Sequence, residues 1–193
     1  MSNPKVNIKS IVNLSNNHYI LDKINFDYQT KNGEWQNQNR ESYNRGDGAA
    51  ILLYNSVKKT VILTKQFRMP SYLNGNTNGM MIEVCAGLLD ADDPLTCIKK
   101  EAEEETGYKI NKPVKLFEIY STPGAVTEKI HYFIAEVDHN MKVSDGGGLE
   151  DETEEIEVLE IPFEKTLKMI STGEICDAKT IILLQYAQIH KLV

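Results

Sequence analysis

The alternation of apolar and polar positions along the chain predicts a sheet-rich protein with a few helices. Apolar stretches of strand length are expected to form strands at residues 49–54, 60–68, 81–85, 114–120, 130–137 and 156–161. Near the end of the chain, the apolar pattern predicts helices at residues 163–171 and 180–192. The second of these is apolar at Ile181, Leu184, Ile189 and Leu192.

The N-terminal part of the chain predicts extended structure of a more polar kind. Residues 24–28 alternate clearly, and Lys31-Asn32-Gly33 is a hairpin-turn signal after which Trp35 begins the return strand. This hairpin has little apolar surface, so we expect it to pack on its own domain or on a partner subunit. We therefore expect an N-terminal β region at residues 1–45, which dimerises, and a main domain at residues 46–193.

A further helix is expected in the middle of the chain. Asp92 or Asp93 can cap its N-terminus, Pro94 suits the first helical position, and Gly107 can end it in a left-handed conformation. Before this helix, Gly87 is expected to let the backbone turn tightly after the strand at residues 81–85.

Three glutamates share one face of this helix. Glu101, Glu104 and Glu105 stand at i, i+3 and i+4, and like charges at these spacings destabilise a helix. They also lie toward the C-terminus, where the helix dipole disfavours anions. A divalent cation would offset this cost, because hard cations prefer oxygen ligands; the alternative is a solvated acidic face. The opposite, buried stripe is expected to contain Leu95, Ile98 and Ala102.

The order of the expected elements indicates the fold class. Strands precede and follow the central helix, and two more helices end the chain. This order predicts an α/β protein in which helices pack on both faces of a mixed sheet.

Composition narrows the class of partner. The chain has 193 residues, 41% hydrophobic and 25% charged, as in ordinary globular proteins. A net charge of -7 argues against non-specific binding to nucleic acid. No stretch approaches membrane-spanning length, so no membrane partner is expected. Three cysteines without Cys-x-x-Cys spacing favour a reducing, cytoplasmic compartment.

The central stretch resembles the signature of the Nudix hydrolases. That signature reads Gly, five residues, Glu, seven residues, Arg-Glu, an aliphatic residue, any residue, Glu-Glu, any residue, Gly. Residues 100–107, Lys-Glu-Ala-Glu-Glu-Glu-Thr-Gly, match its second half with Lys100 in place of Arg. In the first half, Gly87 lies one residue closer to the helix than the signature requires, and Asp92 or Asp93 stands where Glu is usual.

The resemblance extends over nearly the whole chain. Residues 40–46, 65–68, 83–90, 121–124 and 146–152 are similar to the ADP-ribose pyrophosphatase branch of the Nudix hydrolases. Within that branch, Cys85, the shortened turn, the triple glycine at residues 146–148 and residues 173–180 are most similar to the GDP-mannose pyrophosphatases.

This resemblance implies a fold, a reaction and an assembly. The fold would be an α/β/α sandwich with the signature helix beside the sheet. The reaction would be Mg²⁺-dependent hydrolysis of a nucleotide sugar, GDP-mannose to GMP and mannose 1-phosphate. The protein would be a homodimer in which the N-terminal hairpin packs on the partner.

The resemblance also implies residue roles. The metal ligands would be the Ala86 carbonyl, Glu101, Glu105 and Glu152. The catalytic residues would be Glu104, Glu105 and Glu152, the last on a loop made flexible by the triple glycine, with Asp151 as the alternative mobile acid. The substrate-binding residues would be His18, Asn39, Arg40, Glu41, Arg68, Ala86, Gly87, Leu88, Glu128, Asp151 and Lys179.

Two other functions stay open from the sequence. Within the same enzyme class, the substrate could be ADP-ribose. Outside it, the chain could be a module that binds a nucleotide sugar without cleaving it. Retention of Glu101, Glu104 and Glu105 favours the enzyme, because a sensor has no need of a metal cluster.

Overall fold

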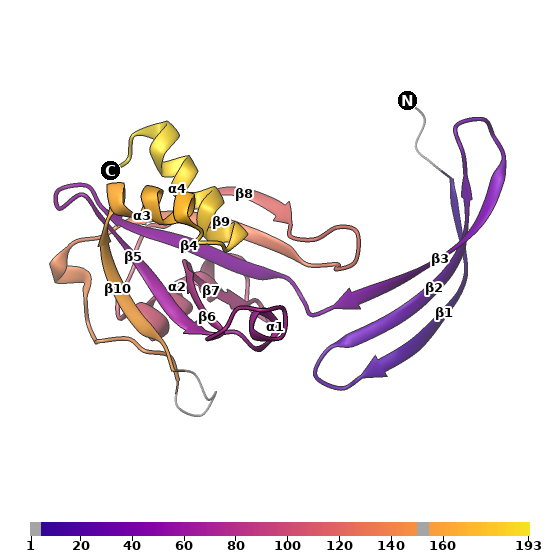
Figure 1. Cartoon of the computed structure of the whole chain (residues 1–193), viewed down its shortest axis with the longest axis horizontal. Coiled ribbons are helices and arrows are strands. Elements are labelled where there is room, and N and C mark those ends of the chain that lie inside the picture. Colours follow the sequence, from indigo (N-terminus) through magenta and orange to yellow (C-terminus); the bar gives the residue numbers. More distant parts are fainter. Residues whose placement is uncertain (1–4, 150–154) are drawn as a thin grey trace. The chain divides into compact units, whose positions relative to one another are not determined.

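The chain forms two compact units in the computed structural model, which describes residues 5–149 and 155–193 (Figure 1). The N-terminal unit comprises the described residues up to Asp47 together with Tyr120–Lys129. The main unit comprises Gly48–Ile119 and the described part of Ile130–Val193.

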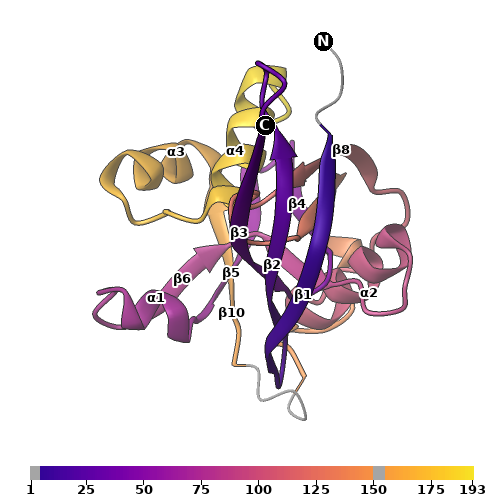
Figure 2. The same cartoon turned by 90° about the vertical axis from the view of Figure 1, so that its right-hand side faces the viewer.

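The N-terminal unit is built on an antiparallel sheet of three strands. These are β1 (Val6–Asn16), β2 (Ile20–Gln29) and β3 (Trp35–Asn44), in that spatial order, and Figure 2 shows them side by side. The hairpin predicted between β2 and β3 is confirmed: Gly33 has a φ of 86° and its amide donates to the Thr30 carbonyl. The sheet has one strand more than the predicted hairpin.

The main unit contains a mixed sheet of seven strands. They are β4 (Gly48–Asn55), β5 (Thr60–Phe67), β6 (Met80–Glu83), β7 (Cys85–Leu88), β8 (Val114–Tyr120), β9 (Lys129–Glu136) and β10 (Glu157–Pro162). The order is β10-β5-β4-β9-β8, with β6 paired to β5 and β7 paired to β4. The β4–β9 pair is parallel, whereas β4–β5 and β5–β10 are antiparallel.

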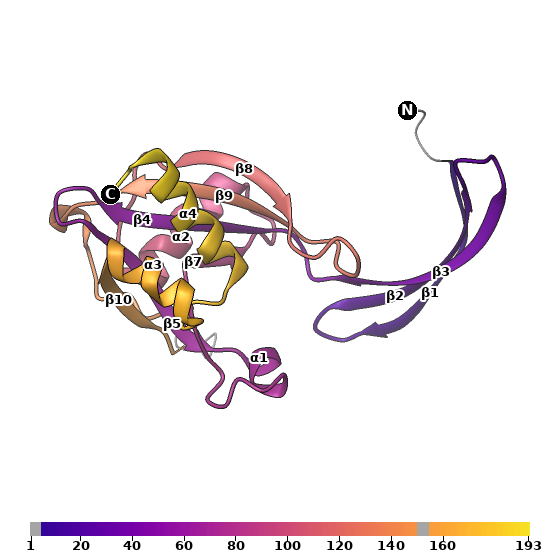
Figure 3. The same cartoon turned by 45° about the horizontal axis from the view of Figure 1, so that its top comes forward.

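Helices cover both faces of this sheet, as predicted (Figures 1 and 3). The helices are α1 (Met69–Leu73), α2 (Pro94–Thr106), α3 (Phe163–Thr172) and α4 (Ala178–His190). Alternate residues of β4 point to opposite faces. Ile51 and Leu53 pack in a core with Ile98 of α2, while Leu52 packs in a second core with Leu184 of α4. The α/β/α sandwich expected from the resemblance is therefore confirmed.

β4 and β5 pair with each other over only part of their length, and the two short strands β6 and β7 pair with the remaining parts. β5 pairs with the end of β4, from Leu53 to Asn55, whereas β7 pairs with the beginning of β4, from Gly48 to Ile51. β6 pairs with the far end of β5, so the chain crosses from β5 to β4 at the single residue Val84. Residues on β6 and β7 therefore lie inside the sheet.

Several local predictions differ from the structure. The short helix α1 was not predicted, and α4 begins at Ala178 rather than residue 180 and ends at His190. Leu95 was expected in the buried stripe of α2 but is 43% exposed, because it lies in the first turn of α2, outside the contact with the sheet that buries Ile98 and Ala102. None of the described helices has the length and apolar character needed to cross a membrane.

Candidate active site

Helix α2 is fixed at both ends by its own sequence. The carboxylate of Asp93 accepts hydrogen bonds from the amides of Leu95 (3.0 Å) and Thr96 (3.2 Å), so Asp93 rather than Asp92 is the N-cap. Bonds from the Thr96 hydroxyl and amide hold the pKa of Asp93 below its usual value. Gly107 ends the helix with a φ of 77°, as predicted.

Gly87 has a different role from the predicted one. It lies within β7, opposite Ala49 of β4, and the tight turn comes later, at Asp90 with a φ of 47°. The glycine makes room for an acidic side chain: a Cβ added at Gly87 would lie 2.0 Å from Oε1 of Glu101. The carboxylate of Glu101 therefore lies directly against the backbone of β7.

Glu105 reaches the same strand from the next turn of α2. Its side chain is buried, with the residue 2% exposed, and its Oε2 accepts a hydrogen bond of 3.2 Å from the amide of Ala86. Burial raises the pKa of the Cys85 thiol, and the nearby charges of Glu105 and then Glu101 raise it further. Both carboxylates thus converge on residues 85–87.

The remaining signature glutamate and Leu88 lie at the edge of this group. Glu104 is half-buried, and its carboxylate lies 3.8 Å from the ammonium of Lys100. Leu88 is the last residue of β7, and its carbonyl accepts a bond of 3.3 Å from the thiol of Cys97.

Two carboxylates against one strand suit a hard divalent cation. Glu101, Glu105 and the carbonyl of Ala86 would supply oxygen donors from one side, and the space at Gly87 that a Cβ would fill holds a carboxylate instead. Within residues 5–149 and 155–193, no three acidic, histidine or cysteine side chains gather into a complete ligand set. The predicted fourth ligand, Glu152, and its alternative Asp151 lie outside the described residues.

The triple glycine at residues 146–148, predicted to make its loop flexible, is hydrogen-bonded to the end of α2. The amide of Gly147 donates to the carbonyl of Glu105 (2.9 Å), and that of Gly148 donates to the carbonyl of Glu104 (3.2 Å). A Cβ at Gly146 would lie 2.5 Å from the Glu105 carbonyl oxygen, and all three glycines have positive φ. These residues satisfy carbonyls at the end of α2, which explains why glycine is needed there.

The two predicted phosphate-binding cations meet on a residue that was not predicted. Glu83 is 4% exposed; its Oε2 accepts a bond of 2.7 Å from Nε of Arg68, and its Oε1 accepts one of 2.8 Å from Nζ of Lys179. Arg68 directly follows β5, and Lys179 lies in the first turn of α4. The sequence feature that could have indicated Glu83 is its position as the single carboxylate within the apolar stretch at residues 81–85.

The other predicted substrate-binding residues belong to the N-terminal unit. These are His18, Asn39, Arg40, Glu41 and Glu128. His18 is exposed and its ring lies 4.3 Å from that of Tyr19. Nη1 of Arg40 donates to the carbonyl of Asn39 (2.7 Å).

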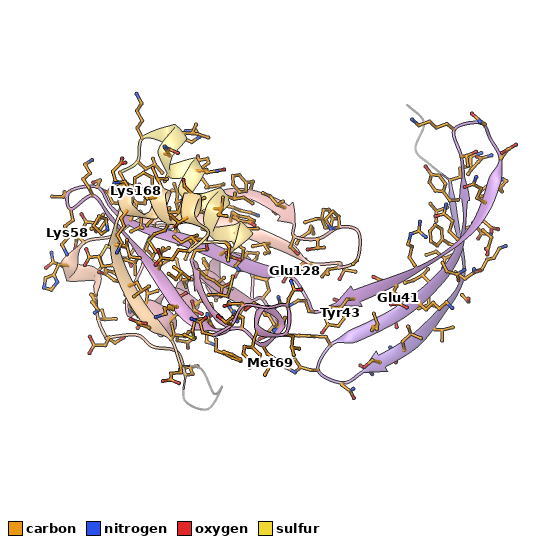
Figure 4. The ribbon with its side chains drawn as sticks, viewed as in Figure 1. Glu41, Tyr43, Lys58, Met69, Glu128 and Lys168 are labelled. Atoms are coloured by element: carbon orange, nitrogen blue, oxygen red, sulfur yellow. The ribbon has the colours of Figure 1, made fainter. Side chains whose placement is uncertain are left out.

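Glu128 is held firmly within that unit. It is buried, accepts a bond of 2.6 Å from the hydroxyl of Ser121, and lies 3.2 Å from the guanidinium of Arg45. Figure 4 labels Glu128 at the loop between β8 and β9, and Glu41 and Tyr43 on β3. The carboxylate of Glu128 is therefore oriented by the hydroxyl of Ser121 and the guanidinium of Arg45.

Comparison with known families decides the assignment. Residues 44–181 match the model of the NUDIX domain. The chain belongs to the Nudix family. The match confirms the resemblance seen in the sequence, and identifies a Nudix pyrophosphohydrolase. Nudix hydrolases generally use divalent metal cations, in agreement with the paired carboxylates on α2.

Similarity to individual Nudix proteins extends beyond this domain. Residues 5–43 match the model described as the GDP-mannose pyrophosphatase NudK N-terminal domain. Proteins named GDP-mannose pyrophosphatase from Shigella dysenteriae serotype 1 (strain Sd197), Escherichia coli O157:H7 and Salmonella typhimurium (strain LT2) are each 54% identical over 180 residues. The alignment covers 93% of this chain and 93% of each relative.

Proposed function

We propose that this Nudix protein hydrolyses GDP-mannose to GMP and mannose 1-phosphate, with Mg²⁺ as its cofactor. The observation that carries the proposal is 54% identity, over 93% of both chains, to proteins named GDP-mannose pyrophosphatase. The N-terminal region contributes to it as well, because residues 5–43 match a domain named after the same enzyme.

The carboxylates on α2 serve the metal. Hydrolysis requires water to attack a phosphorus of the diphosphate while negative oxygens are neutralised and a proton is removed. Glu101, Glu105 and the Ala86 carbonyl would hold Mg²⁺, which when bound neutralises phosphate charge and orients water. Burial of Glu105 and its bond to the Ala86 amide keep that carboxylate in one orientation.

The remaining roles follow from charge and position. Arg68 and Lys179 would bind phosphate oxygens, since the guanidinium offers a planar fork and the ammonium a point charge. Glu152 is proposed as the carboxylate that accepts the proton from water, with Asp151 as the alternative, and Glu104 as a helper at the metal. Gly87 and Leu88 would line the substrate beside the diphosphate.

We assign the nucleotide and the sugar to residues of the N-terminal unit. His18, Asn39, Arg40 and Glu41 would contact the nucleotide from a partner subunit of a homodimer, and Glu128 would contact the sugar. The dimer is supported by exposed apolar residues along β1, namely Val6, Ile8, Ile11, Val12 and Leu14. In this proposal the dimerising region is residues 1–45 and the catalytic domain residues 46–193.

A cytoplasmic location and Mg²⁺ are parts of the same proposal. All three cysteines carry free thiols, as expected in a reducing compartment. The proposed ligands are all hard oxygens, and Mg²⁺ is the ion that usually accompanies nucleotide phosphates.

The experiment is a product assay with purified protein and Mg²⁺. GDP-mannose should give GMP and mannose 1-phosphate in equal amounts, and its kcat/KM should exceed that for ADP-ribose. A higher kcat/KM for ADP-ribose would show that ADP-ribose, rather than GDP-mannose, is the preferred substrate. Binding without turnover of either compound, with Mg²⁺ present, would instead support a nucleotide-sugar-binding module.

A further inference from the structure

Glu83 is a buried anion with a cation on each oxygen. It ends β6, where it pairs with Thr64 of β5, and the residue is 4% exposed. Oε2 binds Nε of Arg68 at 2.7 Å, and Oε1 binds Nζ of Lys179 at 2.8 Å. Two cations from distant parts of the chain, after β5 and at the start of α4, are thus held by one carboxylate.

A second anion orients the lysine. Asp177 is the N-cap of α4: its Oδ2 accepts from the amide of Thr180 (2.9 Å), and its Oδ1 accepts from Nζ of Lys179 (2.8 Å). Burial on its own lowers the pKa of Lys179, but the charges of Glu83 and Asp177 outweigh this and hold it above the usual value. Lys179 therefore stays an ammonium.

The arginine keeps most of its hydrogen-bonding capacity. Its bond to Glu83 uses Nε, and its two Nη groups form no hydrogen bond with another residue of the described ranges. A guanidinium held at Nε can still present both Nη groups as a fork to phosphate oxygens. The side chain of Arg68 is 42% exposed, so the fork is accessible.

We propose that Glu83 is a positioning residue that sets Arg68 and Lys179 side by side so that together they bind the diphosphate of the substrate. The inference rests on the proposed function and deepens it, because it gives a role to a buried residue that the proposed function leaves without one. Glu83 lies three residues before Ala86, so β6 and β7 place the cation pair and the carboxylates of α2 along one stretch of backbone.

Removing the negative charge of Glu83 distinguishes a positioning role from a purely electrostatic effect on diphosphate binding. Removing an anion next to two cations would by itself strengthen the binding of another anion. If Glu83 positions the cations, its removal should instead weaken diphosphate binding, because Arg68 and Lys179 then lose their common anchor. The two explanations therefore predict changes of opposite sign.

The test measures inorganic diphosphate binding by calorimetry, with divalent cations removed by chelation, for wild type and E83Q. We expect E83Q to bind diphosphate about 10-fold more weakly, and to raise the KM for GDP-mannose by a similar factor with a smaller change in kcat. E83D, which keeps the charge but withdraws the carboxylate, should also weaken binding, and decides the matter if E83Q does not fold. E160Q is the matched control, since it breaks the exposed Lys58–Glu160 ion pair (3.1 Å).

The outcomes distinguish this inference from the proposed function. Equal or tighter diphosphate binding by folded E83Q and E83D would overturn it, as would a wild type that binds no diphosphate. In the K179M background, the effect of E83Q should shrink, because one of the two anchored groups is already gone. If wild type binds diphosphate but hydrolyses no nucleotide sugar, the proposed function fails while the positioning role stands.

Discussion

At the scale of single residues, the site depends on carboxylates placed where a carboxylate is costly. Glu105 and Glu83 are both almost fully buried, and an ionised group in such a place needs partners. Glu83 has two cations, whereas Glu105 accepts a bond from the Ala86 amide and, together with Glu101, lies near the buried Cys85 thiol. A second negative charge beside Glu105 is the arrangement that a bound cation would stabilise.

Replacing Glu105 tests its role at the metal. E105Q preserves the shape of the side chain and an oxygen that can accept the bond from the Ala86 amide, but removes the charge. We expect kcat to fall by about 100-fold, with a smaller change in substrate affinity. Steady-state kinetics at several Mg²⁺ concentrations, with a separate binding measurement, would show this.

The same helix offers a matched control for that change. Glu103 lies on another face of α2, 3.9 Å from the ammonium of Lys109, so E103Q should leave kcat almost unchanged. Activity retained in E105Q, or lost equally in E103Q, would contradict the assignment.

Gly87 gives a steric prediction. A methyl group there would lie 2.0 Å from Oε1 of Glu101, and the flexible glutamate rather than the strand would move. We expect G87A to fold normally but to bind Mg²⁺ about 10- to 100-fold more weakly, measured by metal titration. In the E101A background the added methyl meets no carboxylate, so G87A should cause no further loss; a further loss there would refute the steric explanation.

At the scale of elements, α2 was predicted best because its signals are local. The Asp93 cap, Pro94 and the Gly107 stop act within one or two turns of the helix, and the structure has all three. Strand β7 was not predicted, because the four residues Cys85–Leu88 become a strand only by pairing with β4. The bonds from the glycines at residues 146–148 to α2 likewise join residues about 40 positions apart, so no local pattern indicates them.

The cap of α2 gives a prediction for stability. D93A should lower the Tm by about 3 °C, because two amides at the start of the helix lose their acceptor. D92A, at the alternative cap position, should change the Tm much less. The reverse order would show that Asp92 caps the helix in solution.

The pH dependence of this difference follows from the lowered pKa of Asp93. The bonds to Thr96 favour the ionised form in the folded state, so the stabilisation is complete above the pKa of the unfolded chain. It is lost as the pH falls through the lower, folded-state value. Thermal melts of wild type and D93A should therefore differ at neutral pH and converge in strong acid.

At the scale of the whole molecule, the N-terminal sheet exposes apolar side chains along its edge strand β1. Val6, Ile8, Ile11, Val12 and Leu14 of β1 are each between 48% and 59% exposed. Apolar patches on a protein surface commonly mark contacts between proteins. The described residues therefore leave about half of the surface of each of these residues exposed.

This surface predicts a dimer in solution. Wild type should elute with twice the mass of the chain in size-exclusion chromatography with light scattering, and a double substitution I8E/I11E should shift it to the monomer. V57E is the control, because Val57 is 89% exposed in the turn between β4 and β5 of the main unit. A monomeric wild type at micromolar concentration would contradict the proposed assembly.

The sequence by itself determined the fold class, the central helix with its glycine stop, the Nudix family and which glutamates form the signature, whereas it left the N-cap open between Asp92 and Asp93. These features depend on the spacing of nearby residues. The hydrophobic periodicity, the capping residues and the glutamates on one helix face each involve residues within one strand or a few helical turns. The tertiary structure alone decided that Gly87 makes room for Glu101, that the triple glycine is bonded to the end of α2, and that Glu83 joins Arg68 to Lys179. Those features depend on contacts between residues far apart in the chain, which no local pattern records.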